Sequence, residues 1–210
     1  TPKEEESFSI WRQEVGLPEE KIMLSCMDDN FWGPTGNGGP CGPTTEIYID
    51  GLEVWNIVFN EYYCHGARDR LLTGEAQLEK LKFNGIDTGM GLERLLAVIN
   101  GADDVYAIDL LQPLLEKIRR LAPEPEERKK RIIADHLRSS AFLIADGVRP
   151  MNKEAGYILR RLLRRMMAYQ IDFASLTEMA AEWLKEKYGS IYPELKENGK
   201  IAEVLMAEYL

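Results

Sequence analysis

The chain has 210 residues, of which 45% are hydrophobic and 29% charged. This is the composition of an ordinary globular protein, and it excludes disordered and fibrous classes. The 26 Lys and Arg against 35 Asp and Glu give a net charge of -9, which on its own argues against a nucleic-acid partner. No apolar run approaches the ~18 residues of a membrane span, so we expect no membrane association. Three cysteines cannot all pair, and we expect a reducing cytoplasm.

The charge is unevenly distributed along the chain. Residues 1–116 hold 8 basic and 21 acidic residues, a net charge of -13. Residues 117–170 hold 14 basic and 6 acidic residues, a net charge of +8, and residues 171–210 carry -4. A basic block between two acidic ones indicates either solvated helix faces or a nucleic-acid contact, and both readings stay open.

The first half of the chain contains the strand signals. Residues 8–15 have the apolar spacing of a short helix. Residues 33–43 contain five Gly and three Pro, which predicts a loop rather than a helix or strand. Residues 45–50 and 52–63 are rich in β-branched and aromatic residues and flank an Asp-Gly turn, so we predict an antiparallel hairpin. Residues 66–82 are polar, and we expect a loop with a short helix there.

The second half contains helix signals throughout. The apolar spacing and the Gly and Pro stops predict helices over 91–101, 108–122 with a kink at Pro113, 126–147, 154–168, 175–188 and 194–210. Strands first and helices later indicate an α+β protein, in which an antiparallel sheet is followed by an all-helical region. We place the domains at 1–110 and 111–210.

One candidate ligand site spans residues 87–94. Gly89 and Gly91 allow close approach of a ligand to the backbone at a helix start, where N–H groups and a partial positive charge are available. Arg94 follows in the first turn and can hold a polyphosphate. Neither the dinucleotide nor the P-loop glycine pattern is present. A plain helix-entry turn with a solvent-facing Arg94 is the alternative.

A second candidate pocket lies around Trp32 and Asn56. Trp32 precedes the Gly and Pro loop and can close a pocket as a flat apolar wall; the alternative is a surface loop pinned by aromatics. Asn56 interrupts an apolar strand, so its amide needs a specific partner, either a ligand or a neighbour in the core. His65 and His136 stand alone and the cysteines lack zinc-ligand spacing, so we predict no metal site.

The basic block contains one further constellation. Arg160, Arg161, Arg164 and Arg165 recur on adjacent turns of the predicted helix 154–168 and form one broad basic face. The loop before it carries Asn152. Arginines with an amide at the helix entry suit a nucleic-acid backbone plus one base-edge contact. The alternative is pairing of these arginines with nearby carboxylates.

Five blocks of sequence occur in the order known from one family. They are DDNFW, GPCGPTTEIYID, EVWNIVFNEYY, DTGMGLERL and RIIADHLRSSAFLIADGVRPMNKEAGYILRRLLRR. From about residue 10 to its end, the chain thus resembles the alanyl-tRNA synthetases, which are class II aminoacyl-tRNA synthetases. The block DTGMGLER resembles the third signature motif of class II. The resemblance implies the later part of an aminoacylation domain followed by the start of a helical tRNA-recognition region.

The resemblance also implies an ATP site. Arg94 would bind the terminal phosphates of ATP, with Mg²⁺ neutralising their charge, while Gly89 and Gly91 would let the adenine lie against the backbone. Arg94 and Asp87 would be the catalytic residues. In this family the alanine carboxylate attacks the α-phosphate of ATP, and the alanyl group is then transferred to the 3′ end of the tRNA. Such chemistry depends on positioning and electrostatics.

The amino-acid and tRNA contacts are implied in the same way. Asp87 would be a buried carboxylate that binds the ammonium group of alanine, and Trp32, Asn56 and Val58 would complete the alanine site. The acceptor stem of tRNA(Ala) would meet a second group of residues on the helical region: Asn152, Arg160, Arg161 and Arg164.

Two departures from the family pattern matter. The first and second signature motifs do not occur in the chain, and Thr44 stands where the family often has a cysteine. We therefore expect an incomplete active site, with the missing N-terminal part in the same or a partner chain, and an isolated chain that is inactive. The alternatives are a non-catalytic tRNA-binding module, a split subunit of a class II synthetase and a ligase for another small amino acid.

Overall fold

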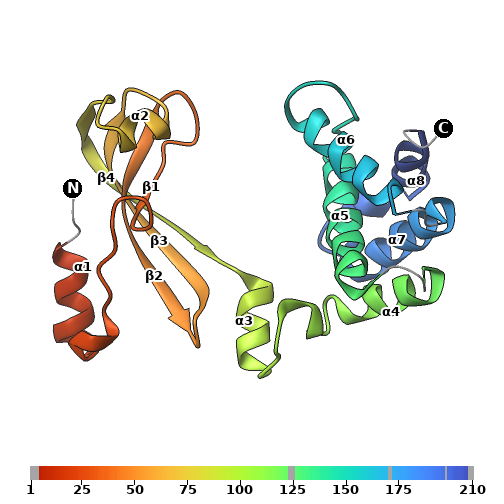
Figure 1. The fold of residues 1–210 in the computed structure, drawn as a ribbon, viewed down its shortest axis with the longest axis horizontal. Helices are drawn as coiled ribbons and strands as arrows, with labels where there is room; N and C mark the ends of the chain where they lie inside the picture. The colour runs from red at the N-terminus through yellow and green to blue at the C-terminus, as the bar shows by residue number, and fades with distance from the viewer. Residues whose placement is uncertain (1–4, 123–125, 170–171, 197, 208–210) are drawn as a thin grey trace. The chain divides into compact units, whose positions relative to one another are not determined.

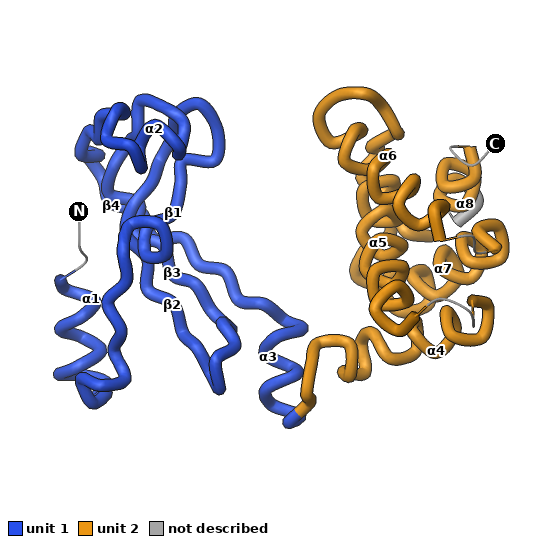
Figure 2. The backbone as a smooth tube through the Cα atoms, viewed as in Figure 1, with its two compact units in different colours: residues 1–101 blue, residues 102–210 orange. Residues whose placement is uncertain are grey.

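The structure is a computed structural model that describes residues 5–122, 126–169, 172–196 and 198–207, with the side chains of 198 and 199 left out. The chain forms a sheet-containing unit and a helical unit (Figure 1), divided between residues 101 and 102 (Figure 2). The division comes before the expected boundary at 110/111. Its reason is that Arg131 of the helical unit pairs with Asp104 at 2.9 Å and lies 5.3 Å from the centre of the Tyr106 ring.

The first unit is built on a four-stranded antiparallel sheet. Its strands lie in the order β1-β2-β3-β4 and span Phe31–Trp32, Gly39–Ile49, Leu52–Cys64 and Leu78–Met90. The predicted hairpin is confirmed as β2 and β3. Asp50 and Gly51 connect them with φ values of 50° and 81°. Two adjacent positive φ values are typical of the tight turns that match the twist of a hairpin.

Two sequence predictions about this sheet are wrong. Strand β2 begins at Gly39, inside the segment predicted to be a loop. A Cβ at Gly42 would lie 1.6 Å from the carbonyl oxygen of Phe59, so glycine is what lets β2 approach β3 here. Strand β4 occupies the end of the expected polar loop and continues to Met90, which places Gly89 in a strand rather than at a helix start.

Short helices surround the sheet. In place of one helix over 8–15, the chain has α1 (Glu5–Ser9) followed by a π-helical turn (Ile10–Glu14). The remaining short elements are a 3₁₀ turn (Glu19–Lys21), α2 (Arg68–Leu72) and α3 (Leu92–Ile99). One small buried cluster of this unit consists of Phe31, Cys41, Cys64 and Leu71, and Val54, Val58 and Ala97 are buried outside it.

The second unit is helical. Its elements are a 3₁₀ turn (Val105–Ala107), α4 (Gln112–Leu121), α5 (Glu127–Ala145), α6 (Glu154–Met167), α7 (Phe173–Tyr188), a 3₁₀ turn (Pro193–Lys196) and α8 (Asn198–Ala207). One continuous apolar core joins all five helices, with fully buried Leu115, Leu137, Leu163, Leu184 and Leu205 among its members.

Two further features of the helical unit follow from its sequence. Pro113 lies in the first turn of α4, so it begins this helix instead of kinking a longer one. Proline is well tolerated there because the first backbone N–H groups of a helix have no partner within it. None of the helices in the described ranges is long and apolar enough to cross a bilayer.

Candidate functional site

The strands place polar and small residues from three positions in the sequence on one face of the sheet. Asn56 of β3 lies between Glu46 of β2 and Gly89 of β4, its direct partners on either side. Val58 lies in the same way between Thr44 and Asp87. Directly opposed residues of antiparallel strands project to the same face. Four of the residues predicted as ligand contacts, Asn56, Val58, Asp87 and Gly89, therefore share one face.

Trp32 lies on β1, next to this part of the sheet. It pairs with Gly42 of β2, within the stretch where the pairing of β2 with β3 shifts between Cys41 and Thr44, so strand alternation does not assign its side chain to the face of Asn56 and Val58. Its ring is partly accessible, with 39% of the residue exposed. Val58 is buried, so the face has an apolar floor beside its polar groups.

Asp87 is exposed rather than buried, contrary to the expectation. It lies on β4, which forms the edge of the sheet in the described part of the chain. Its Oδ1 atom accepts a hydrogen bond of 2.9 Å from the backbone N–H of Thr88. This hydrogen bond orients the Asp87 carboxylate. Because the carboxylate is exposed, a cationic group can reach it.

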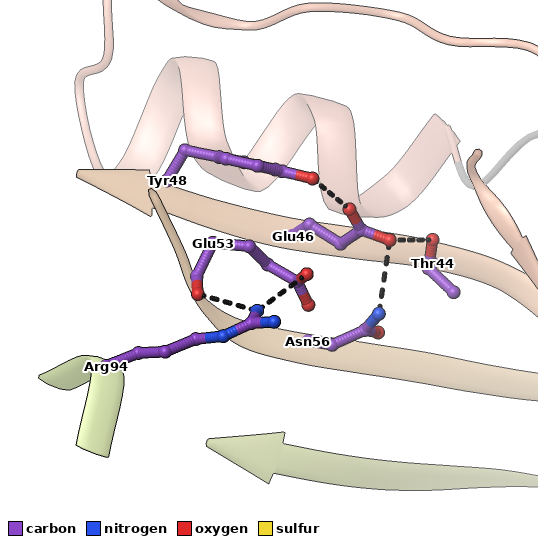
Figure 3. Close-up of polar contacts among 6 residues, drawn as sticks. All are labelled: Thr44, Glu46, Tyr48, Glu53, Asn56 and Arg94. Carbon is purple, nitrogen blue, oxygen red and sulfur yellow. Dashed lines mark hydrogen bonds and ion pairs between the residues drawn. The ribbon is translucent and has the colours of Figure 1, made fainter. Parts of the chain in front are cut away.

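Arg94 lies in the first turn of α3, as predicted. Gly91 precedes the helix in an extended conformation and donates its backbone N–H to the carbonyl of Val54 at 3.0 Å, which attaches the helix start to β3. The guanidinium donates to both the carbonyl oxygen and the carboxylate of Glu53, each at 3.0 Å (Figure 3). Arg94 is thus oriented toward the hairpin that carries Asn56.

A β-bulge brings Glu53 to this side of the hairpin. Asn56 pairs with Glu46, whereas Glu53 pairs with Tyr48, so Val54 is an extra residue in β3. A bulge of this kind reverses the alternation of side chains on either side of it. Glu53 and Asn56 consequently project to the same face although they are three residues apart.

Glu46 connects the polar groups of the face (Figure 3). Its Oε1 atom accepts hydrogen bonds from Asn56 Nδ2 at 3.1 Å and Thr44 Oγ1 at 3.4 Å, and its Oε2 atom accepts from the Tyr48 hydroxyl at 2.8 Å. The hydrogen bond to Glu46 raises the pKa of Tyr48 to about 12, with the neighbouring charges of Glu46 and Glu53 adding to it. The Tyr48 hydroxyl therefore keeps its proton, and stays a donor, to a higher pH than an ordinary tyrosine.

Sequence reasoning missed three members of this face, namely Glu46, Tyr48 and Glu53. Their positions in the sequence could have indicated them, because the charged residues Glu46 and Glu53 interrupt the two apolar strands of the predicted hairpin outside its turn. A partner for Asn56 was expected on physical grounds, but the bulge that makes Glu46 that partner has no sequence signature.

The predicted basic face is present on α6, with one difference. Arg161, Arg164 and Arg165 are exposed, on the side opposite the buried Leu159 and Leu163. Arg160 instead lies at the flank of the helix, half-buried, and donates a hydrogen bond to the side-chain oxygen of Asn152.

The entry to α6 is closely packed. A Cβ at Gly156 would lie 2.5 Å from the carbonyl oxygen of Arg149, so this glycine brings the preceding loop against the helix. Arg161 stacks near the Tyr157 ring, 5.7 Å from its centre. Across the described ranges, no group of three or more His, Cys, Asp and Glu side chains is arranged to hold a metal ion.

Comparison with known proteins identifies the family. A family model described as tRNA synthetases class II (A) matches residues 1–209. The mitochondrial alanine–tRNA ligase of Dictyostelium discoideum is 38% identical over 98% of this chain and 24% of its own length. The alanine–tRNA ligase of Rubrobacter xylanophilus is 37% identical over the whole of this chain and 27% of its own. The chain thus spans about a quarter of the length of these relatives, and it belongs to the class II tRNA synthetase family.

Proposed function

We propose that the chain is part of an alanine–tRNA ligase. In this reaction the carboxylate of alanine attacks the α-phosphate of ATP, pyrophosphate leaves, and the alanyl group is transferred to the 3′ end of tRNA. The observation that carries the proposal is the single sheet face that combines Asn56, Val58, Asp87 and Gly89, next to the helix α3 with Arg94 in its first turn. Relatives named alanine–tRNA ligase support the choice of amino acid.

The alanine site would lie over β3. Asp87 offers an accessible carboxylate to the ammonium group, and a charge-assisted hydrogen bond of this kind is among the strongest in proteins. Val58 and Trp32 offer apolar surface to the methyl group, and Asn56 contributes a polar contact. Gly89, opposite Asn56, adds no side chain that would fill the space above it.

The ATP site would lie at the start of α3. Arg94 would bind the terminal phosphates, for which the fork of donors on a guanidinium is well suited. In the structure this fork holds the carboxylate of Glu53, so phosphate oxygens would share or replace that partner. Gly91, and Gly89 from its position in β4, would lie along the adenine.

Mg²⁺ fits this arrangement. It is commonly bound by one or two carboxylates together with the phosphates of a nucleotide, and Glu53 offers one carboxylate within 3.0 Å of Arg94. When bound, the ion would neutralise the charge of the phosphates. The protein's own contribution would be to position the two substrates.

The tRNA site would lie on α6. The acceptor stem of tRNA(Ala) would contact the exposed Arg161 and Arg164 through its phosphates. Asn152, held in place by Arg160, would be available at the helix entry for a base edge. The non-catalytic tRNA-binding module is disfavoured because binding alone needs neither Asp87 nor Arg94.

The first prediction concerns activity. We expect the full gene product to catalyse alanine-dependent exchange of pyrophosphate into ATP, and the isolated chain 1–210 to lack exchange because it spans about a quarter of the length of its relatives. The variant Arg94→Ala should abolish exchange in the full gene product, whereas Arg12→Ala should not, since the ion-pair partner of Arg12 is Glu19, which is not among the residues assigned to the site.

Three outcomes would contradict the proposal. Exchange that responds to another small amino acid but not to alanine would reassign the substrate. Exchange by the isolated chain near the rate of the full gene product would refute incompleteness. Unimpaired exchange by Arg94→Ala would remove Arg94 from the ATP site.

The expected cytoplasmic location stays a prediction, because one of the relatives is mitochondrial by name.

A further inference from the structure

The amide of Asn56 has a defined orientation. Its Nδ2 atom donates to Glu46 Oε1 at 3.1 Å. An ionised carboxylate can only accept hydrogen bonds, so a flipped amide would bring its oxygen against the oxygens of Glu46. Glu46 therefore fixes which end of the Asn56 side chain is the donor and which is the acceptor.

Glu46 is itself fixed by two other donors. The Tyr48 hydroxyl holds Oε2 at 2.8 Å, and Thr44 Oγ1 lies 3.4 Å from Oε1 (Figure 3). Both come from the same strand as Glu46, so they do not depend on β3. The carboxylate is thus held by β2 and presented to Asn56 across the hairpin.

The other end of the amide has no partner in the described part of the chain. Asn56 Oδ1 is buried, yet no hydrogen bond reaches it. A buried acceptor without a donor is costly, and such atoms in folded proteins call for an explanation. On this face Gly89 lies directly across from Asn56, and Asp87, also an acceptor, lies across from the neighbouring Val58. An acceptor without a donor, on the same face as an exposed carboxylate that receives one hydrogen bond from the Thr88 N–H, suits a cationic group with several N–H donors.

We propose that Glu46 is a positioning residue for amino-acid binding, which acts by holding Asn56 so that its Oδ1 atom accepts from the ammonium group of the substrate. The inference rests on the proposed function, because it takes alanine as the ligand of this face. Glu46 does not contact the substrate; its effect passes through Asn56. A primary ammonium group would then bridge Asn56 Oδ1 and the Asp87 carboxylate.

The test compares Michaelis constants for alanine and for ATP in pyrophosphate exchange by the full gene product. Gln in place of Glu46 can donate as well as accept, so the Asn56 amide loses its single orientation. We expect Glu46→Gln to raise the KM for alanine about tenfold, the effect of weakening one hydrogen bond to a charged group. The KM for ATP should change less than about twofold.

A reciprocal swap distinguishes positioning from general damage. The single variant Asn56→Asp places a second carboxylate against that of Glu46. Of the three variants, we expect it to have the highest KM for alanine. In the double variant Glu46→Gln with Asn56→Asp, the Gln amide donates to one oxygen of the carboxylate introduced on β3 and leaves the other oxygen facing the ligand. We expect the double variant to recover most of the affinity for alanine. If Asn56→Asp fails to fold, Glu46→Gln and the double variant still decide the question.

One matched control and one intermediate variant complete the design. Glu79→Gln alters a glutamate of the same sheet that pairs with His65, and Tyr48→Phe removes a different hydrogen bond of Glu46. Glu79→Gln should leave the KM for alanine within about twofold, whereas Tyr48→Phe, which frees Oε2 of Glu46, should raise it by less than Glu46→Gln does. An unchanged KM for alanine in Glu46→Gln, an increase in the KM for ATP instead, or a double variant no better than Glu46→Gln would each overturn the inference. Wild-type protein without alanine-dependent exchange would contradict the proposed function itself.

Discussion

At the level of single residues, the pKa of Tyr48 depends on the hydrogen bond and the charge of Glu46. Its pKa rises from about 10 to about 12, chiefly because its hydroxyl donates to the Glu46 carboxylate. A tyrosine whose pKa is raised in the folded state stabilises the fold at all pH values below 10, and this contribution disappears as the pH rises from 10 to 12. The contribution is small, because Tyr48 is mostly exposed and its hydrogen bond competes with water.

The expected measurement is a titration of tyrosinate absorbance, taken as the difference between wild type and Tyr48→Phe. The difference should appear only near pH 12. In a Glu46→Gln background it should move down toward pH 10, because the neutral amide no longer stabilises the protonated hydroxyl. A wild-type difference that already titrates near pH 10 would show that the hydrogen bond is absent in solution.

The predictability of the site from sequence depends on the kind of residue. Asn56, Val58 and Asp87 were predicted as contacts, and direct pairing with strand alternation accounts for their common face. The partner of Asn56 could not be predicted. Counting back from the hairpin turn pairs Glu46 with Trp55, and only the extra residue at Val54 moves the pairing by one. A single backbone irregularity therefore decided which polar residues meet.

At the level of elements, α6 carries a quantitative expectation for tRNA binding. Each arginine that neutralises a phosphate releases a counterion, so removing one should lower the slope of log affinity against log salt by about 1. We expect this for Arg161→Ala and for Arg164→Ala, measured by filter binding of tRNA to the chain across a salt series. Arg70→Ala is the matched control, because Arg70 pairs with Glu75 in the sheet unit. Binding that is independent of salt would refute the basic face.

Helices were more predictable than strands in this chain. The predicted helices 126–147 and 154–168 correspond to α5 and α6, because their apolar residues recur at a strict helical spacing around the buried core. Strand β4 was missed because its sequence has no run of alternating apolar residues, and 11 of its 13 residues are exposed. Its conformation comes from pairing with β3, a long-range effect that local sequence does not record.

At the level of the whole chain, the two units differ in the size of their cores. The helices of the second unit share one continuous core, whereas the sheet unit buries a small cluster around Phe31 and Cys64. Resistance to local opening follows the amount of buried apolar contact. We therefore expect the backbone amides of β3 to exchange with solvent at least about tenfold faster than those of α5, measured by hydrogen–deuterium exchange of the chain.

A core variant serves as the control for this expectation. Leu137 is fully buried in α5, and Leu137→Ala should lower the free energy of unfolding by about 2–5 kcal/mol. Exchange in α5 should then accelerate while exchange in β3 stays unchanged. Equal protection of β3 and α5 in the wild type, or acceleration of both by Leu137→Ala, would mean that the units open together.

The uncovered strand β4 has a consequence for how such experiments are run. Phe83 and Ile86 on this edge are 86% and 72% exposed, and the backbone groups along the outer side of an edge strand are a template for another strand. Pairing between copies of the chain through β4 would depend on protein concentration. Dilution series belong with every binding and exchange measurement on the chain, so that pairing between copies is separated from the properties of the single molecule.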